Sequence, residues 1–525
     1  NQRGQAITLT AIGRLHSRMG ENQAALDHFK RATQLMEPIG ALAEKGRILT
    51  GMAYVYNQLG DKQKAIDLYN QAFTLFSATG DYSGEAMSMF DAGRVYYSMG
   101  ETETALECYQ RALRASQAAK DRRLESLEIR EIARVYDSRG DKKKALERYL
   151  TALAFFLAEK SSRAAAETLN LIAGVYEFWG QKDKAFTFYN QALVQSRKAE
   201  FRVAEAATHY NLARLERDRG NLAAARQRMD EGLGVVESLR RKVTSQDLRA
   251  SYFATVRQHY ELYVDILMRS QKQDAHAGFE TAAFDISERA RARSLLESLN
   301  EARADIRQGV EPALLEQERN LEHAINVKAE RHAQLVANND NAAAQTVAAE
   351  LNQLTTEYDE VKAQIKSKSP RYAALTQPQP LSLKEIQDRL LDDNSMLLEY
   401  MLGDERSYLW AVTRTEVSSY ELAPRAQIEE AAQKFRKLLT AHQPVPGESF
   451  DQRQARIKES NAHISEVAAS FSQLVLGPAA DKLGTRRLLI VPDGVLQYIP
   501  FQALTVAPAG PANTSGDSGE QVPLL

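Results

Sequence analysis

A glycine that recurs every forty residues constrains the first part of this chain more than any other feature. It stands at Gly20, Gly60, Gly100, Gly140, Gly180 and Gly220. A small residue lies seven positions before each of these glycines, and an alanine lies five positions after each. Nine positions after the glycine, the first five copies carry an aromatic residue: Phe29, Tyr69, Tyr109, Tyr149 and Tyr189. Regular spacing of this kind indicates a stack of similar structural units.

The second copy shows what one unit folds into. Its apolar residues fall at helical spacing: Ile48, Met52, Val55, Tyr56 and Leu59. Gly60 can take the left-handed conformation that ends a helix, and Asp61 is placed to cap the next helix. Each unit is therefore predicted to be a helical hairpin whose small residues let the two helices approach closely. Because one hairpin cannot bury its apolar face alone, six hairpins over residues 1–240 are expected to stack into a superhelix with a concave groove.

This pattern resembles the tetratricopeptide repeat, in a forty-residue form. The sixth copy departs from the pattern, since Glu216 and Met229 stand where aromatic residues are expected. Such a departure is typical of a terminal repeat that passes into a different structure.

The next two segments are predicted to be helical but lie outside the forty-residue register. Residues 241–311 are expected to close the end of the superhelix. Residues 312–375 are expected to form a projecting antiparallel helical hairpin around the turn Asn338–Asn341. The second helix of this hairpin has an apolar stripe spaced alternately by four and three residues, as in a coiled coil. The stripe consists of Val347, Leu351, Leu354, Tyr358, Val361 and Ile365.

Beyond the stiff segment Thr376–Pro380 the pattern becomes mixed. The predicted strands are residues 396–402, 408–412 and 417–422, together with 488–491, an apolar run typical of a buried strand. The predicted helices are residues 426–440 and 454–475. Alternating strands and helices predict the N-terminal part of an α/β domain over residues 376–525. Residues 507–521, rich in glycine, proline and serine, are predicted to be a flexible loop.

Three stretches after the repeats carry a second resemblance. They are Ser287–Glu297, Tyr372–Pro380 with the hairpin Glu399–Val412 after it, and Leu488–Leu504. Together they resemble bacterial CHAT proteins, in which a caspase-like domain follows tetratricopeptide repeats. The resemblance covers nearly the whole chain and implies a cysteine peptidase related to caspases and separase. It also implies a catalytic histidine and cysteine downstream of these stretches. Residues 505–525 contain neither, so the chain is expected to be inactive by itself and to be part of a longer protein.

One position of the repeat points to partner recognition. It follows the small residue directly, and the resemblance to tetratricopeptide repeats implies that it faces the concave groove. The residues there are Arg14, Tyr54, Arg94, Arg134, Gly174 and Arg214. Stacked repeats would set the arginines in a column about 10 Å apart, each able to hold a carboxylate.

This column predicts an acidic protein or peptide ligand in the groove. Tyr97, Phe178 and Tyr210 are candidate apolar anchors, although each is equally suited to core packing. The alternative is that the arginines are solvated and neutralised by neighbours such as Asp137 and Glu177.

Other chemistries have little support in the sequence. Cys108 is the only cysteine and lies inside a predicted helix of the third repeat, where a structural role is favoured over a nucleophilic one. The nine histidines show no metal-ligand spacing, and no phosphate-binding loop is present, so neither a metal nor a cofactor is expected. The net charge of −2 and the absence of a long basic run disfavour nucleic acid. No apolar run is long enough to span a membrane, and a cytoplasmic location is expected, although an upstream signal or anchor stays open.

Two functions remain open at this point. The first is that the chain is the recognition and regulatory part of a CHAT-type cysteine peptidase, binding a partner in the repeat groove. The second is that it is a non-catalytic scaffold whose C-terminal domain is a degenerate pseudo-peptidase. A pure repeat adaptor is disfavoured, because residues 395–504 are rich in strands.

Overall fold

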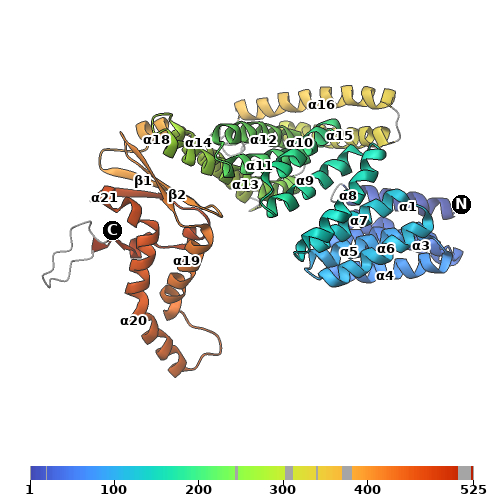
Figure 1. Ribbon diagram of the computed structural model, residues 1–525, viewed down its shortest axis with the longest axis horizontal. Helices are drawn as coiled ribbons and strands as arrows, with labels where there is room; N and C mark the ends of the chain where they lie inside the picture. The colour runs from blue at the N-terminus through green and yellow to red at the C-terminus, as the bar shows by residue number, and fades with distance from the viewer. Residues whose placement is uncertain are drawn as a thin grey trace. The chain divides into compact units, whose positions relative to one another are not determined.

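The computed structural model describes residues 2–18, 21–242, 246–301, 311–337, 341–368, 381–506 and 522–523. It is mainly helical, with tandem helical hairpins followed by a small mixed sheet, which confirms the predicted fold class (Figure 1). The chain divides into two compact units, residues 1–215 and 216–525, and each is described by itself. The predicted loop at 507–521 and the segment Thr376–Pro380 lie outside the described residues.

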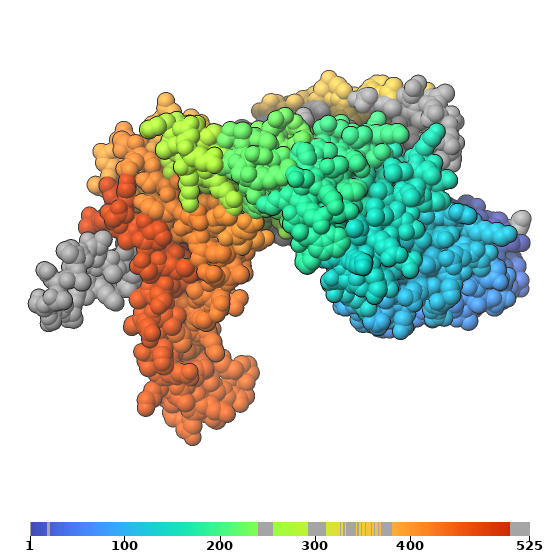
Figure 2. Space-filling model, in the orientation of Figure 1, coloured from blue at the N-terminus to red at the C-terminus, as the bar shows by residue number. Residues whose placement is uncertain are grey.

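The repeat region consists of paired helices of similar length, and the part in unit one forms a closely packed surface from blue to teal in the space-filling view (Figure 2). The first helix of each hairpin, called here an A helix, is α1 (Gln2–Arg18), α3 (Leu42–Gln58), α5 (Tyr82–Ser98), α7 (Arg122–Ser138), α9 (Ser162–Phe178) or α11 (Arg202–Asp218). The second, called a B helix, is α2 (Asn22–Met36), α4 (Lys62–Thr79), α6 (Thr102–Ala119), α8 (Lys142–Ala158), α10 (Lys182–Lys198) or α12 (Leu222–Lys242). The unit boundary falls inside α11.

The turn inside each hairpin has the predicted geometry. Gly60 has a φ of +84°, in the left-handed region that L side chains rarely adopt. The side chain of Asp61 accepts a hydrogen bond from the Lys64 N–H at 3.2 Å and so caps α4. The equivalent glycines also have positive φ: Gly100, Gly140, Gly180 and Gly220.

Close contact between the A and B helices explains the small residues. A Cβ added at Gly93 would lie 2.8 Å from the ring of Tyr109, too close for an unshifted contact. Gly13 stands in the same relation to Phe29, at 2.9 Å. The five repeat aromatics are at most 2% exposed, so each ring fills the space that a small residue leaves open.

Unit two begins with the end of α11 and with α12, and further helices follow. These are α13 (Gln246–Gln273), α14 (Phe279–Glu301), α15 (Pro312–Ala337), α16 (Asn341–Lys368) and the short α18 (Leu383–Arg389). Val361 and Ile365 of the predicted stripe pack against Leu314, so α15 and α16 form a hairpin in which the stripe is buried.

A four-stranded sheet follows, in the order β3-β2-β1-β4. The strands are β1 (Ser395–Met401), β2 (Ser407–Val412), β3 (Val417–Leu422) and β4 (Arg487–Val491). Strands β1 to β3 are antiparallel neighbours, whereas β4 pairs with β1 in parallel. The sequence predicts a buried strand at 488–491, but β4 is an edge strand of intermediate exposure, because no described strand pairs with its outer side.

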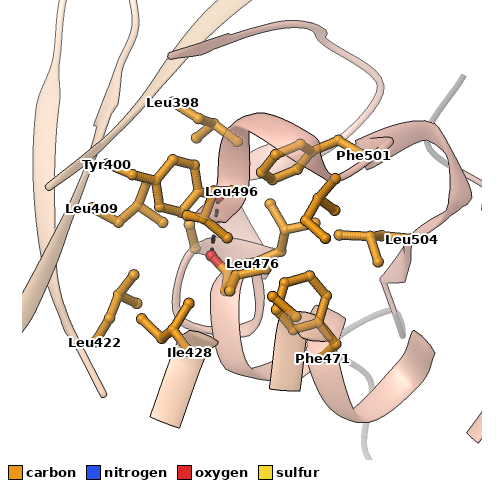
Figure 3. Packing of buried hydrophobic residues seen from close by; sticks show 14 of the residues in the cluster. Leu398, Tyr400, Leu409, Leu422, Ile428, Phe471, Leu476, Leu496, Phe501 and Leu504 are labelled. Atoms are coloured by element: carbon orange, nitrogen blue, oxygen red, sulfur yellow. Dashed lines mark hydrogen bonds between the residues drawn. The ribbon is translucent and has the colours of Figure 1, made fainter. Parts of the chain in front are cut away.

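Alternate residues of the sheet face different helices. On one face, Leu398 and Tyr400 pack with α19 (Arg425–Leu439) and α20 (Phe450–Val475), as Figure 3 shows. The Tyr400 hydroxyl, buried in this core, donates to the Val475 carbonyl at 3.1 Å. On the other face, Trp410 meets Phe284 of α14 edge-on, with ring centroids 6.0 Å apart.

The first prediction concerns the small position of repeat four. Ala133→Leu forces three carbon atoms into a fully buried site between α7 and α8 and is expected to cost about 1–3 kcal/mol. Urea denaturation should show a lower midpoint, and hydrogen exchange should quicken in the flanking repeats, since repeats stabilise their neighbours. Ala154→Leu on the exposed side of α8 is the control and should change stability by at most about 0.5 kcal/mol. Equal midpoints for the two variants would contradict the assigned register.

Candidate functional site

The predicted recognition residues lie on five of the six A helices. Arg14 is on α1, Tyr54 on α3, Arg94 and Tyr97 on α5, Arg134 on α7 and Arg214 on α11. We call this set the arginine row. Two of its members contact residues 37 positions earlier: the Arg134 guanidinium lies 5.2 Å from the Tyr97 ring centroid, and Arg214 binds Glu177 of α9 at 2.9 Å. The row residues therefore reach from one A helix to the A helix before it.

Around Arg94 the row is only loosely neutralised. The nearest acid is Asp91, one turn earlier on α5, and the closest approach of the two side chains is 3.6 Å. The Arg94 side chain is 60% exposed, more than any other described ion-paired arginine of the row. Tyr54 of the preceding A helix is 41% exposed. The buried Tyr69 of α4 is a neighbour of Tyr54, Asp91 and Arg94.

Burial has a clear effect on Asp91. It raises the pKa of this carboxyl to about 6, and the nearby Arg94 only partly opposes the shift. Asp91 is therefore partly protonated just below neutral pH. Protonation removes the negative charge that faces Arg94, so the guanidinium becomes more available to an outside carboxylate.

Around Arg134 the neutralisation is stronger. Glu131 accepts a hydrogen bond from Arg134 at 2.7 Å and another from Arg130 at 3.1 Å. Arg130 also donates to Glu167 of the next A helix at 2.7 Å. Arg134 thus belongs to a charge network that holds α7 and α9 together, and it stacks on Tyr97 as well.

Arg214 is held most fully. Its guanidinium donates to Glu177, which also accepts a hydrogen bond from the buried Tyr189 hydroxyl at 2.9 Å. The Arg214 side chain is 36% exposed. The predicted neutralisation by Glu177 is thus present at this end of the row, whereas Asp137 accepts from Lys142 and Tyr149 instead.

The remaining predicted residues differ in exposure. Phe178 is 67% exposed and lies 4.8 Å from the Lys142 ammonium, so it is free of the core. Arg14 is exposed and donates to the Arg47 carbonyl at 3.4 Å. Tyr97 and Tyr210 are half-buried.

Sequence reasoning missed two acids of this site, Asp91 and Glu131. Each lies three residues before a row arginine on the same helix, a spacing that places side chains together. That spacing was the available signal. The site is consequently a mixed row of acids and arginines in which the Arg94 side chain is more exposed than those of Arg134 and Arg214.

A separate buried cluster lies in unit two, between α14, β1 and the end of β4. Glu399 of β1 is 1% exposed and accepts hydrogen bonds from Ser287 at 2.9 Å and Arg291 at 3.2 Å. Arg291 also donates to the carbonyls of Tyr400 and Pro492. The cluster joins α14 to the ends of β1 and β4.

Asp493, directly after β4, extends this junction. Its side chain accepts a hydrogen bond from the Leu402 N–H at 2.8 Å and from Arg257 of α13 at 3.0 Å. The polar side chains of this junction, Glu399 and Asp493, each have hydrogen-bond partners from neighbouring helices. We therefore assign the cluster a structural role.

Among the described residues, the one thiol is buried and no cluster suited to a metal ion is present. Cys108 is 8% exposed, and burial raises the pKa of its thiol to about 11, so the reactive thiolate is scarce at neutral pH. Across the described ranges, no group of three or more His, Cys, Asp or Glu side chains is arranged to hold a metal ion. None of the helices in those ranges combines the length and apolar character that a bilayer crossing requires.

Comparison with known families identifies the repeats. A tetratricopeptide-repeat profile matches residues 44–118, and a second tetratricopeptide-repeat profile matches residues 166–193. The repeats are tetratricopeptide repeats. No family profile of the CHAT domain matches, and no curated protein matches the sequence.

Solved structures with tetratricopeptide-like folds resemble part of the chain. Apo RapI is 17% identical and covers 55% of this chain and 98% of its own, with a TM-score of 0.42. Aspartyl phosphate phosphatase F from Bacillus subtilis is 14% identical and covers 54% of this chain and 70% of its own, with a TM-score of 0.40. A STAND protein from Pyrococcus horikoshii with a tetratricopeptide repeat sensor is 18% identical and covers 42% and 34%, with a TM-score of 0.38.

The second prediction follows from the raised pKa of Asp91. The pKa of Asp91 is 3.8 in the unfolded chain and about 6 in the folded protein. Between these two pH values the folded protein binds more protons than the unfolded chain, so the contribution of Asp91 to stability falls as the pH rises. Asp91→Asn should therefore match the parent near pH 4 and exceed its stability by about 1–3 kcal/mol at pH 7.5. Urea denaturation at both pH values measures the difference. Asp67→Asn, at an exposed site on α4, should leave the pH dependence unchanged. If Asp91→Asn also leaves it unchanged, burial does not control this carboxyl.

Proposed function

We propose that this chain recognises a protein partner through its tetratricopeptide repeats, and that the arginine row around Arg94 binds an acidic segment of that partner. The single observation that supports this most directly is the state of Arg94. Its side chain is largely exposed and its only acidic neighbour on α5 is 3.6 Å away. A ligand carboxylate could therefore form the closer, charge-assisted hydrogen bond that Asp91 does not.

The residues beside Arg94 suggest what else the ligand carries. Tyr54 is an exposed aromatic ring on the A helix before Arg94, and Tyr97 lies one turn after Arg94 on the same helix. Rings at these positions favour an apolar or aromatic side chain next to the acidic residue. The proposed ligand is thus an acidic peptide segment with an adjacent apolar side chain.

We also propose that the C-terminal part, residues 376–525, is the beginning of a caspase-like domain of the CHAT kind, with residues 1–240 as its recognition module. The described residues of the stretches that carry the resemblance meet around Glu399 and Asp493, and β4 forms an edge of the described sheet, to which a further strand could add. Residues 241–311 are proposed to be a helical extension that closes the end of the superhelix, and residues 312–375 a projecting antiparallel helical hairpin.

A non-catalytic scaffold with a degenerate pseudo-peptidase domain is the second candidate function. Within these residues the one thiol, Cys108, is buried, so this candidate asks nothing of the chain beyond partner binding. In both cases the chain binds a partner and does not itself cut one.

The third prediction tests the binding site. Fluorescein-labelled peptides selected from a random twelve-residue display library on the parent protein should contain Asp or Glu next to an apolar residue. Arg94→Gln should weaken these peptides at least tenfold in fluorescence anisotropy at 0.15 M salt, since a charge-assisted hydrogen bond contributes about 1.5–3 kcal/mol. Gln is chosen because a negative residue beside Asp91 would add repulsion.

Two controls accompany this experiment. Arg114→Gln removes an exposed arginine from the B helix α6 with the same change in net charge, and its affinity should stay within twofold of the parent. Replacing the peptide's acidic residue with its amide should abolish the difference between parent and Arg94→Gln, as a double-mutant cycle requires. Peptides that bind parent and Arg94→Gln equally well would refute the proposed site.

The fourth prediction concerns peptidase activity. The purified chain should show no thiol-dependent cleavage of fluorescent casein, and Cys108→Ser should behave as the parent does, because the thiol is buried and its pKa is raised. Cleavage that disappears in Cys108→Ser would show that Cys108 is a nucleophile.

A further inference from the structure

The B helices of repeats four and five carry a second surface, which we call the trough. It is a cavity of about 600 Å³, open to solvent, with Leu157 of α8 on one side and α10 on the other. Leu169 of α9 forms its floor, and Phe186 and Val194 of α10 form its other apolar wall. Both Leu157 and Val194 are strongly exposed, at 47% and 64%.

The forty-residue register shows that these exposed apolar residues are unusual. The positions equivalent to Leu157 in the other repeats hold Glu37, Ser77, Gln117, Arg197 and Glu237. The positions equivalent to Val194 hold Gln34, Thr74, Arg114, Ala154 and Gly234. The fold therefore accepts polar residues at both places, and packing within the solenoid does not require an aliphatic side chain at either. The two side chains are instead exposed and accessible to a ligand.

The shape of the trough selects the occupant. α8 and α10 are consecutive B helices, and each packs against α9, which leaves a channel between them with α9 at its base. The wall residues Phe186, Asn190 and Val194 follow one another at intervals of four along α10, a length of about 12 Å or two helical turns. A helix with apolar anchors at positions i, i+3 or i+4, and i+7 spans the same length, and its side chains fit a channel between two helices.

The rim of the trough defines the flanks of that occupant. The polar residues that line it are Thr187, Asn190, Gln191 and Gln195, and no lining residue is charged. Neutral amides pair well with neutral polar groups, while a charged flank would lose hydration without gaining an opposite charge. The trough thus differs in chemistry from the mixed acid and arginine row on the A helices.

We propose that the trough binds an amphipathic helix of a partner protein, with aliphatic or aromatic anchors on one face and neutral polar residues beside them. This site is independent of the arginine row, so one solenoid presents two ligand surfaces of different chemistry. The trough volume also falls within the roughly 300–1,000 Å³ typical of pockets that enclose a ligand.

The fifth prediction tests this site with a display library of 21-residue helical peptides. The library varies three anchors, at i, i+4 and i+7, among Leu, Ile, Phe, Met and Gln. All other positions hold Ala or neutral polar residues. Selection on the full chain should enrich apolar anchors. Leu157→Gln combined with Val194→Gln should weaken the selected peptides at least tenfold in fluorescence anisotropy. Glutamine is suitable because Gln117 and Gln34 occupy the equivalent positions of other repeats, so the double variant is expected to fold.

Leu150→Gln is the matched control. Leu150 lies on the same helix and is 40% exposed, but it does not line the trough, so its replacement should change affinity by less than twofold. Hydrogen exchange should show that the bound peptide protects α8 and α10.

Three results would overturn the proposal. The first is a selection without enrichment of apolar anchors, and the second is a set of peptides that bind the double variant as well as the parent. The third is a parent that sediments as a dimer while the double variant is monomeric, because the trough would then bind a second copy of this chain. Since Arg94→Gln leaves the trough intact, failure here and failure at the arginine row can be told apart.

Discussion

The repeat region depends on one contact, in which an aromatic ring of each of the first five B helices packs against a small residue of its A helix. At Gly93 this contact leaves no room for a Cβ, which would lie 2.8 Å from the Tyr109 ring. Every hairpin must therefore close at nearly the same distance and angle, and hairpins of equal shape can stack. This constraint explains why glycine or alanine recurs at the same position of every repeat.

The same tyrosines also organise charge. Their rings are buried in the hairpin core, but the hydroxyls of Tyr149 and Tyr189 reach acids of the A helices, at 3.3 Å from Asp137 and 2.9 Å from Glu177. A core tyrosine thereby holds an acidic side chain in place through a hydrogen bond, and Glu177 in turn accepts a hydrogen bond from Arg214. Packing and electrostatics are linked through one side chain, so the arginines of the row are not equivalent.

In unit two, polar contacts fix how helix α14 packs on the sheet, which apolar packing alone would specify less closely. Glu399 is buried on the sheet face opposite the Tyr400 core and is satisfied only because Ser287 and Arg291 of α14 meet it there. Removing either partner would leave a buried carboxyl with fewer hydrogen bonds, which costs more than an exposed ion pair contributes. The sheet and the helix before it are consequently held in one arrangement.

The sequence by itself determined the elements and their register. Period, turn glycines and caps are local properties, so the hairpins, the coiled-coil stripe and strands β1 to β3 could be predicted to within a few residues. The arginine row could also be found, because six copies of one unit place equivalent residues on equivalent helices.

Only the tertiary structure decided how available each of these residues is. The exposure of Arg94, the pairing of Arg134 with Glu131 and the edge position of β4 depend on which side chains other segments bring near them. The trough is of the same kind, since Leu157 and Val194 lie 37 residues apart and meet only when α8 and α10 stack on α9. Spacing along the chain specifies which face a residue occupies, whereas burial and charge pairing arise from contacts between segments that the spacing does not encode.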